Sequence, residues 1–180
     1  MEDVSRQNLN NHRFDFTLEI AAYWRDHYFE GQAVLPAVEI LILAAAALRR
    51  HCPDARLQSM IDARFQRLLA LDAGVDRRTV AFNIEEVEQG WSVALLSSLL
   101  MKGGVRRTLE HARVVFGGDE AVAPPTPVFQ NIEKLSGDCL SVPAFAVYRS
   151  LVPFGAAYQN IVGDVSVSKE GALAYLSGGA

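Results

Sequence analysis

The hydrophobic and polar positions change their period several times along the chain. Residues 14–20, FDFTLEI, alternate, with aromatic and aliphatic side chains on one side and Asp, Thr and Glu on the other. An alternation of period two predicts a half-buried strand. Residues 24–35 have mixed polarity and contain Gly31, which predicts a loop.

A long apolar helix is predicted after this loop. Pro36 opens it, because a proline at the start of a helix sacrifices no hydrogen bond. The helix continues to about Arg50 and is rich in Ala, Leu and Ile nearly all round, so we expect it to be buried on most faces. Positive residues at 49–51 suit the helix dipole in the last turn, and Pro53 follows as a stop.

The pattern then changes to that of strands. Turns are indicated at 76–78 and 88–90, between four segments that read as strands: 60–71, 79–87, 91–99 and 108–116. Residues 94–100 are so apolar that the pattern alone does not separate helix from strand. The first 117 residues therefore predict an α+β class in which one antiparallel sheet wraps one long helix.

The second part of the chain repeats this order weakly. Residues 118–141 start within GGDEAVAPPTP and are predicted to be a linker. A short helix or turn at 142–151 and strands at 160–167 and 171–176 follow. We expect a first domain at 1–117 and the beginning of a second, incomplete domain at 142–180.

Composition and charge narrow the class. Half of the 180 residues are hydrophobic, which predicts a globular protein with a core. The net charge is −4 and the arginines are scattered, which argues against a nucleic-acid partner. The two cysteines have no metal-site or disulfide spacing, and we predict no metal and no cofactor.

Residues 1–13 carry no apolar signal core, and the longest apolar run, 38–48, is shorter than the about 20 residues that span a bilayer. We expect a cytoplasmic protein with no membrane partner.

The segment 24–37, WRDHYFEGQAVLPA, carries the candidate chemistry. It places His27, Gly31 and Pro36 in the order H-x3-G-x4-P. Gly31 lets the backbone approach something closely or take a positive φ. Free N–H groups at the start of the helix would stabilise a polarised carbonyl, and a base beside them could remove an α-proton from a thioester. The spacing also fits a purely structural histidine, turn and helix start, and spacing alone does not separate the two interpretations.

The motif, preceded by a tryptophan and an aspartate, resembles the catalytic histidine motif of polyketide synthase dehydratase domains, which are built from two tandem hot-dog folds. The predicted helix resembles the central helix of the first hot dog. FQRLL at 65–69 and EHA at 110–112 resemble two of its strands. YRSLVPFGAAYQNI at 148–161 resembles the opening of the second hot dog. The resemblance covers nearly the whole chain, in the family's order.

Several positions depart from the family pattern. Ala37 replaces a glycine that often follows the proline, Phe154 replaces a tyrosine, and Ala156 replaces a proline. The family's second catalytic residue is an aspartate at the start of the second central helix, and that helix would follow the last residue of this chain. Asp164 falls in a strand-like segment and is not assigned this role. We therefore expect a dehydratase-like domain truncated in its second half.

The resemblance implies a function. In the family, the histidine takes the α-proton of a β-hydroxyacyl thioester on acyl carrier protein, and the aspartic acid protonates the leaving hydroxyl. By this resemblance His27 is the base and the partner is an acyl carrier protein with a phosphopantetheine-linked acyl chain. Asp26 beside it is expected to be solvated. The implied substrate-binding residues are Gly31, Leu35, Pro36, Phe154, Gly155 and Tyr158.

Two alternatives stay open from the sequence. The chain could be a catalytically silent acyl-binding or scaffold domain of the same fold, or a product-template-like cyclase that shares the histidine motif. An incomplete second sheet would leave strand edges unpaired, and such edges tend to find partners. We therefore expect a homo-oligomer.

Overall fold

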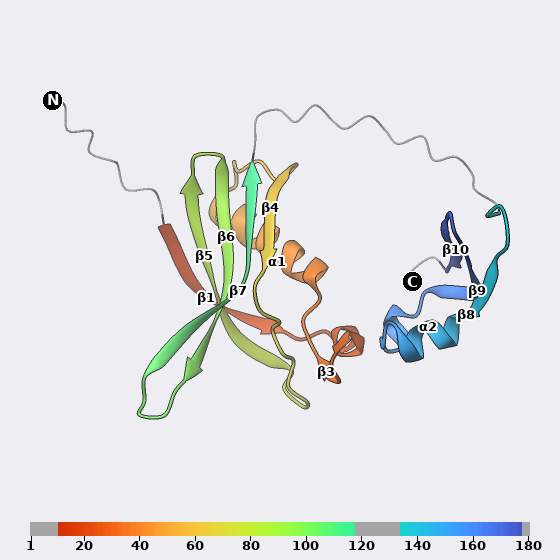
Figure 1. Ribbon diagram of the computed structural model, residues 1–180. Coiled ribbons are helices and arrows are strands. Elements are labelled where there is room, and N and C mark those ends of the chain that lie inside the picture. Colours follow the sequence, from red (N-terminus) through yellow and green to blue (C-terminus); the bar gives the residue numbers. More distant parts are fainter. Residues whose placement is uncertain (1–10, 118–133, 178–180) are drawn as a thin grey trace. The chain divides into compact units, whose positions relative to one another are not determined.

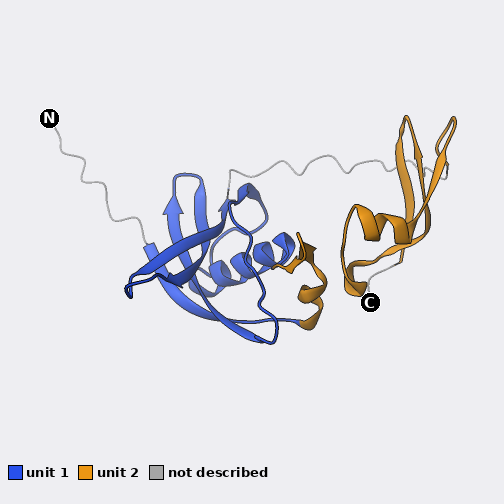
Figure 2. Ribbon diagram, turned by 60° about the horizontal axis from the view of Figure 1, so that its bottom comes forward, with its two compact units in different colours: residues 1–21, 35–122 blue, residues 22–34, 123–180 orange. Residues whose placement is uncertain are grey.

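The computed structural model describes residues 11–117 and 134–177. The N-terminal residues 1–10 and the greater part of the predicted linker, 118–133, lie outside the described residues. The chain divides into two compact units (Figure 2). The described part of the first unit is 11–21 with 35–117, and that of the second is 22–34 with 134–177. The histidine loop thus belongs to the same unit as the C-terminal segment, while the domain boundaries proposed from the sequence stay a prediction.

The first unit is a five-stranded antiparallel sheet in the order β1-β5-β6-β7-β4. The sheet curves beside one long helix, α1 (Ala37–His51), which contacts β5, β6 and β7 (Figure 1). The predicted α+β class is confirmed. The strands are β1 (Asn11–Glu19), β4 (Met60–Phe65), β5 (Arg77–Val87), β6 (Gly90–Leu100) and β7 (Arg106–Gly117).

The core of this unit lies between α1 and the inner face of the sheet. Alternate strand positions supply it, as the period-two pattern of 14–20 predicts, and Leu18 is 1% exposed. The helix contributes a face of four buried residues that includes Leu48, which is fully buried. The largest buried strand side chains are Phe82, Phe116, Leu18, Ile84, Leu95, Val80, Val93 and Val114.

The other face of α1 is open, unlike the expectation of burial on most faces. Val38 and Ile42 are 64% and 56% exposed, and Ala46 continues the same stripe one turn later. The sheet of this unit covers only one side of the helix. The apolar side chains of the helix extend beyond the surface that the sheet covers.

A β-bulge distorts β7 and shortens β4. The register passes from Leu95↔Ala112 to Leu96↔Glu110, so His111 is the extra residue. The carbonyl of His111 accepts hydrogen bonds from the N–H groups of Gln66 (2.9 Å) and Arg67 (3.2 Å). The strand predicted for 60–71 therefore ends at Phe65, where the chain bonds to the bulge instead of continuing the ladder.

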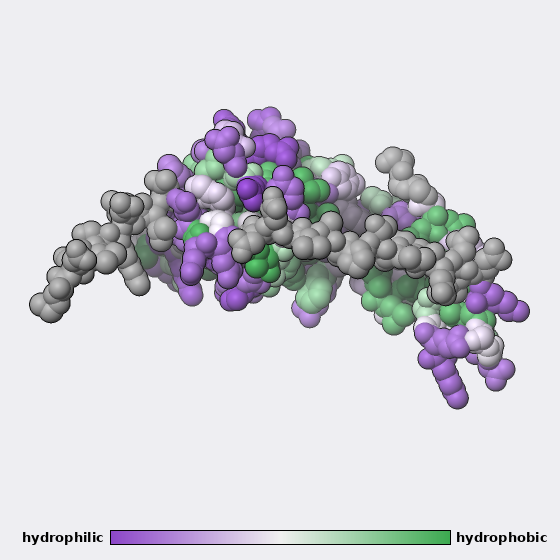
Figure 3. Space-filling model, turned by 90° about the horizontal axis from the view of Figure 1, so that it is seen from above, coloured by the Kyte–Doolittle hydropathy of each residue, from purple (hydrophilic) through white to green (hydrophobic). Residues whose placement is uncertain are grey.

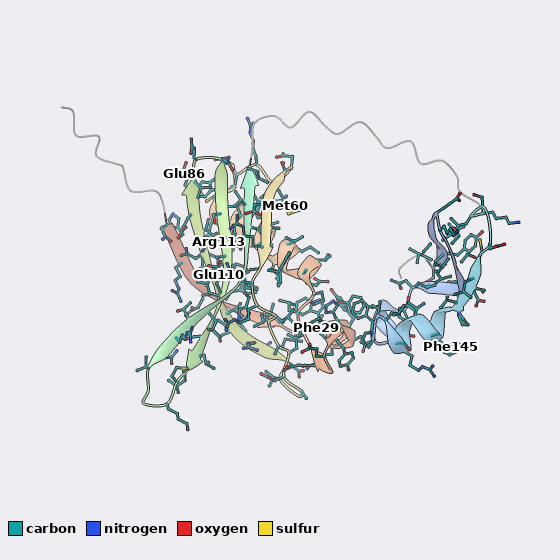
Figure 4. All side chains as sticks on the ribbon, viewed as in Figure 1. Phe29, Met60, Glu86, Glu110, Arg113 and Phe145 are labelled. Carbon is teal, nitrogen blue, oxygen red and sulfur yellow. The ribbon has the colours of Figure 1, made fainter. Side chains whose placement is uncertain are left out.

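A polar network covers the outer face of the same sheet. The Arg113 guanidinium donates to both carboxylate oxygens of Glu110, at 3.1 and 2.6 Å, and to the Ser92 hydroxyl at 3.0 Å (Figure 4). Glu85 lies 3.6 Å from the same guanidinium and accepts from the Asn83 amide at 2.6 Å. Ionised partners strengthen such bonds, so this network ties three neighbouring strands together.

The second unit contains a three-stranded antiparallel sheet in the order β10-β9-β8. The strands predicted at 160–167 and 171–176 are confirmed, and the short helix or turn predicted at 142–151 corresponds to a short helix. The elements are β8 (Leu140–Pro143), α2 (Ala144–Ser150), η2 (Ala156–Tyr158), β9 (Ile161–Ser168) and β10 (Gly171–Leu176). The loop contributes η1 (Ala22–Asp26) and a small hairpin, β2 (Tyr28–Phe29) and β3 (Gln32–Ala33).

Both units present apolar side chains at their surfaces (Figure 3). In the second unit, Leu140, Tyr175 and Leu176 are each about two-thirds exposed, and all three lie on the edge strands of its sheet. Within the described residues, no helix is long and apolar enough to cross a membrane.

Candidate active site

The backbone of His27 is fixed on both sides. Its N–H donates to the Trp24 carbonyl at 3.1 Å, which closes the η1 turn, and its carbonyl accepts from Val34 N–H at 2.9 Å. Between these bonds the chain makes the β2–β3 hairpin, whose turn residues Glu30 and Gly31 have φ values of 49° and 78°. Two positive φ angles suit the right-handed twist of a tight hairpin. The short hairpin therefore holds His27 at its base.

Gly31 takes one of the two roles that the sequence allows. Its φ of 78° is in the left-handed region, which glycine adopts without strain. A Cβ added there would meet no described atom within 4 Å. Gly31 thus serves the turn, and no close approach of described backbone explains it.

Two aromatic residues from the far end of the chain surround the His27 ring. The Phe154 ring centroid lies 4.7 Å from that of the imidazole, with an interplanar angle of 31°. The Tyr158 ring stands nearly perpendicular to the imidazole at 5.6 Å, and the Phe154 and Tyr158 rings are 5.7 Å apart. Such distances are typical of packed aromatic pairs. The structure therefore brings together His27, Phe154, Gly155 and Tyr158, which the sequence assigns to one site.

His27 is half-buried. Its imidazole Nδ1 is buried and has no hydrogen-bond partner among the described residues. Because an imidazole nitrogen can donate or accept a hydrogen bond, Nδ1 is an unused polar atom inside the site.

Leu35 and Pro36 belong to the first unit. Leu35 is 2% exposed and its N–H donates to the Leu69 carbonyl at 2.9 Å. Pro36 is buried and is the N-cap of α1, with an extended backbone (φ −62°, ψ 143°). The predicted helix start is thus confirmed, while a role for these two residues in substrate binding stays a prediction.

Asp26, which is expected to be solvated, is partly exposed and also makes a hydrogen bond within the fold. Its carboxylate Oδ2 accepts from the Ala157 N–H at 2.9 Å. No local sequence pattern predicts this contact, because its two partners are 131 positions apart. Asp164, which the sequence leaves without a role, is exposed in β9 and accepts from the Ser141 hydroxyl at 2.5 Å.

An open groove of about 780 Å³ in the first unit contains none of the predicted site residues and includes Asp54, Arg56, Glu88 and Trp91 in its lining. The described residues hold no group of three or more His, Cys, Asp or Glu side chains that could bind a metal ion.

Comparisons with known proteins connect this geometry with a fold. No protein-family model matches the chain. No curated protein sequence matches it either. Solved structures do match. The dehydratase domain from the CurF module of curacin polyketide synthase superposes with a TM-score of 0.66 at 16% identity, over 99% of this chain and 64% of its own. A pyran synthase domain from module nine of the sorangicin pathway superposes with a TM-score of 0.64 at 22% identity, over 93% of this chain and 57% of its own.

Two variants of a third protein, the CurK dehydratase, match with a TM-score of 0.62 at 19% identity, over 96% of this chain and 60% of theirs. Both are described as inactive, one with a histidine replaced by phenylalanine and the other with an aspartate replaced by asparagine. The chain therefore has the hot-dog fold of polyketide synthase dehydratase domains, and it spans about 57–64% of the length of these structures.

Proposed function

We propose that this chain is a dehydratase-like domain that binds a β-hydroxyacyl thioester carried by acyl carrier protein, with His27 as the base. One observation carries the proposal: the His27 ring packs against Phe154 and Tyr158. The sequence resemblance assigns these three residues to a single acyl site. An apolar wall beside a base suits an acyl chain, because it excludes water from the reacting carbon.

In this mechanism the imidazole of His27 takes the α-proton of the thioester. The electron pair of the broken C–H bond forms the double bond between Cα and Cβ, and the β-hydroxyl leaves as water after it receives a proton. The inactive histidine and aspartate variants of the CurK dehydratase support a base and an acid in that protein. We assign the base to His27 and assign the acid to no residue of this chain.

The remaining predicted residues have supporting roles in this proposal. Gly31 shapes the hairpin beside the base. The resemblance also assigns Leu35 and Pro36 to substrate binding, and this assignment stays a prediction. Phe154 and Tyr158 line the acyl chain. Exposed arginine pairs, Arg49 with Arg50 and Arg106 with Arg107, are candidates for contact with an acidic carrier.

The first step can be tested without the acid. A base alone exchanges the α-proton of a thioester for deuterium from heavy water, so we would follow this exchange on a β-hydroxyacyl pantetheine thioester by NMR. His27→Ala should slow the exchange by about 10²- to 10⁴-fold, as expected for loss of a positioned general base. His12→Ala, at an exposed position on β1, is the matched control and should exchange like the wild type.

Each alternative has its own outcome in this experiment. Thioester binding without exchange would indicate the silent acyl-binding or scaffold domain. Formation of a cyclic product from a thioester whose acyl chain carries a second nucleophile would indicate a cyclase, a candidate favoured by the similarity to a pyran synthase domain. Exchange by His27→Ala at the wild-type rate, in a variant that melts like the wild type, would refute the catalytic role of His27. Efficient dehydration by the 180-residue chain alone would place the acid within it, and Asp164 and Glu30 would be tested first.

A further inference from the structure

Asp26 joins the histidine loop to the C-terminal segment with two hydrogen bonds. Its main-chain carbonyl accepts from the Gly155 N–H at 2.7 Å, and its carboxylate Oδ2 accepts from the Ala157 N–H at 2.9 Å. A bond to an ionised acceptor is stronger than one between neutral groups. Asp26 is the last residue of η1 and directly precedes His27. Any movement of the bonded segment is therefore coupled to the residue next to the base.

Gly155 is fitted to Asp26. Its φ of −71° and ψ of 178° are open to every L-amino acid, so the backbone conformation does not require glycine there. A Cβ at this position would overlap Cγ of Asp26 and would lie 2.7 Å from its Cβ. The absence of a side chain at Gly155 thus makes room for the Asp26 carboxylate.

The segment that Asp26 holds is the aromatic wall beside the base. Phe154 precedes Gly155, and Tyr158 follows it after one short turn. Within the segment, the Tyr158 N–H donates to the Gly155 carbonyl at 3.0 Å, and the Gln159 amide donates to the Phe154 carbonyl at 2.8 Å. These internal bonds keep the two rings in one arrangement, and the bonds to Asp26 place that arrangement against the His27 ring.

We propose that Asp26 is a positioning residue, which fixes the Phe154–Tyr158 wall against the His27 imidazole through its two acceptor groups. Its consequence for catalysis rests on the proposed function. The coupling between Asp26, Gly155 and the His27 ring is independent of the proposed function. It can be measured whether or not the chain processes a thioester.

The test uses NMR of the His27 ring protons, because the ring current of a packed Phe154 displaces their resonances. Phe154→Leu defines the resonance positions in the absence of that ring. Asp26→Ala should move the His27 resonances toward these positions. Asp26→Asn should move them less, because its amide oxygen still accepts from the Ala157 N–H. Glu30→Gln, a matched loss of a carboxylate on the same loop, should leave them unchanged.

A double variant separates positioning from general stability. Gly155→Ala alone should displace the His27 resonances, because its methyl group competes with the Asp26 carboxylate for the same space. Added to Asp26→Ala, it should have little further effect, because that space is then free. Residues in contact show such non-additive effects. Equal, independent effects of Gly155→Ala in the two backgrounds would refute the proposal, as would unchanged His27 resonances in both Asp26 variants.

Deuterium exchange of the thioester adds the catalytic readout. Asp26→Ala should lower the exchange rate at saturating thioester, by up to about 10²-fold for a displacement near 1 Å, with a smaller change in the half-saturating concentration. If the wild type shows no exchange, the proposed function fails while the resonance and double-variant results still decide the role of Asp26. If Asp26→Ala does not fold, Asp26→Asn and Gly155→Ala decide it, and wild-type His27 resonances in both would overturn it.

Discussion

His111 is a buried titratable side chain in the first sheet, 3% exposed. Its Nδ1 lies 3.2 Å from the Arg67 carbonyl, which can only accept, so Nδ1 donates and Nε2 accepts from the Ser97 hydroxyl at 2.7 Å. Burial lowers the pKa of the imidazole, which outweighs the opposite effect of its bonds to backbone carbonyls. The folded chain therefore holds this histidine neutral.

This burial predicts a dependence of stability on pH. Above the ordinary histidine value of about 6.5, the folded and unfolded chains both hold His111 neutral. Below about pH 6.5, His111 binds a proton in the unfolded chain but stays neutral in the folded chain. The free energy of unfolding therefore falls as the pH drops from about 6.5 toward the lowered pKa. Thermal melts between about pH 7.5 and about pH 5 measure this loss of stability, because they cover the range in which histidine titrates.

His111→Gln removes the titrating group and should flatten this part of the pH profile, at the cost of a lower melting temperature at neutral pH. His12→Gln replaces an exposed histidine and should keep the wild-type slope. An unchanged slope in His111→Gln would show that the pH dependence arises from other groups.

At the scale of elements, the two faces of α1 predict different costs of substitution. Leu48 is fully buried against the sheet, and Leu48→Ala should lower the free energy of unfolding by about 2–5 kcal/mol. Ile42 is 56% exposed on the opposite face, and Ile42→Ala should change it by about 0.5 kcal/mol or less. Urea denaturation of both variants measures this difference. A cost for Ile42→Ala as large as that for Leu48→Ala would show that the outer face is covered in solution.

At the scale of the whole molecule, the exposed edges of the second sheet predict self-association. The strands β10 and β8 are its edges, and Leu176 on β10 is 69% exposed. Unpaired edges with apolar side chains favour pairing with another chain. We expect light scattering at high concentration to give a dimer or a larger assembly, and Leu176→Lys to shift it toward the monomer.

Leu100→Lys is the control for this substitution, because Leu100 is 68% exposed but lies in the first sheet. It should leave the assembly intact if the contact is made by β10. A monodisperse wild-type monomer at high concentration would contradict the prediction of a homo-oligomer.

The sequence by itself determined the elements that depend on neighbouring residues. Alternation predicts β1, the run after Pro36 predicts α1, and the change of period after Pro53 predicts the strands that follow. The sequence also predicts the loop that carries His27, because Gly31 and the helix-opening proline that follows it are only a few positions apart. These features are local, since periodicity, helix caps and turn glycines act over a few positions.

Only the tertiary structure decided the features that join distant segments. The bulge that buries His111 depends on the register between β6 and β7 and on the end of β4. The packing of Phe154 on His27, and the fit of Gly155 to Asp26, join positions more than a hundred residues apart. A hydrogen bond or a ring contact of this kind has no period along the chain, because its geometry is set by how whole elements pack and not by the residues beside it.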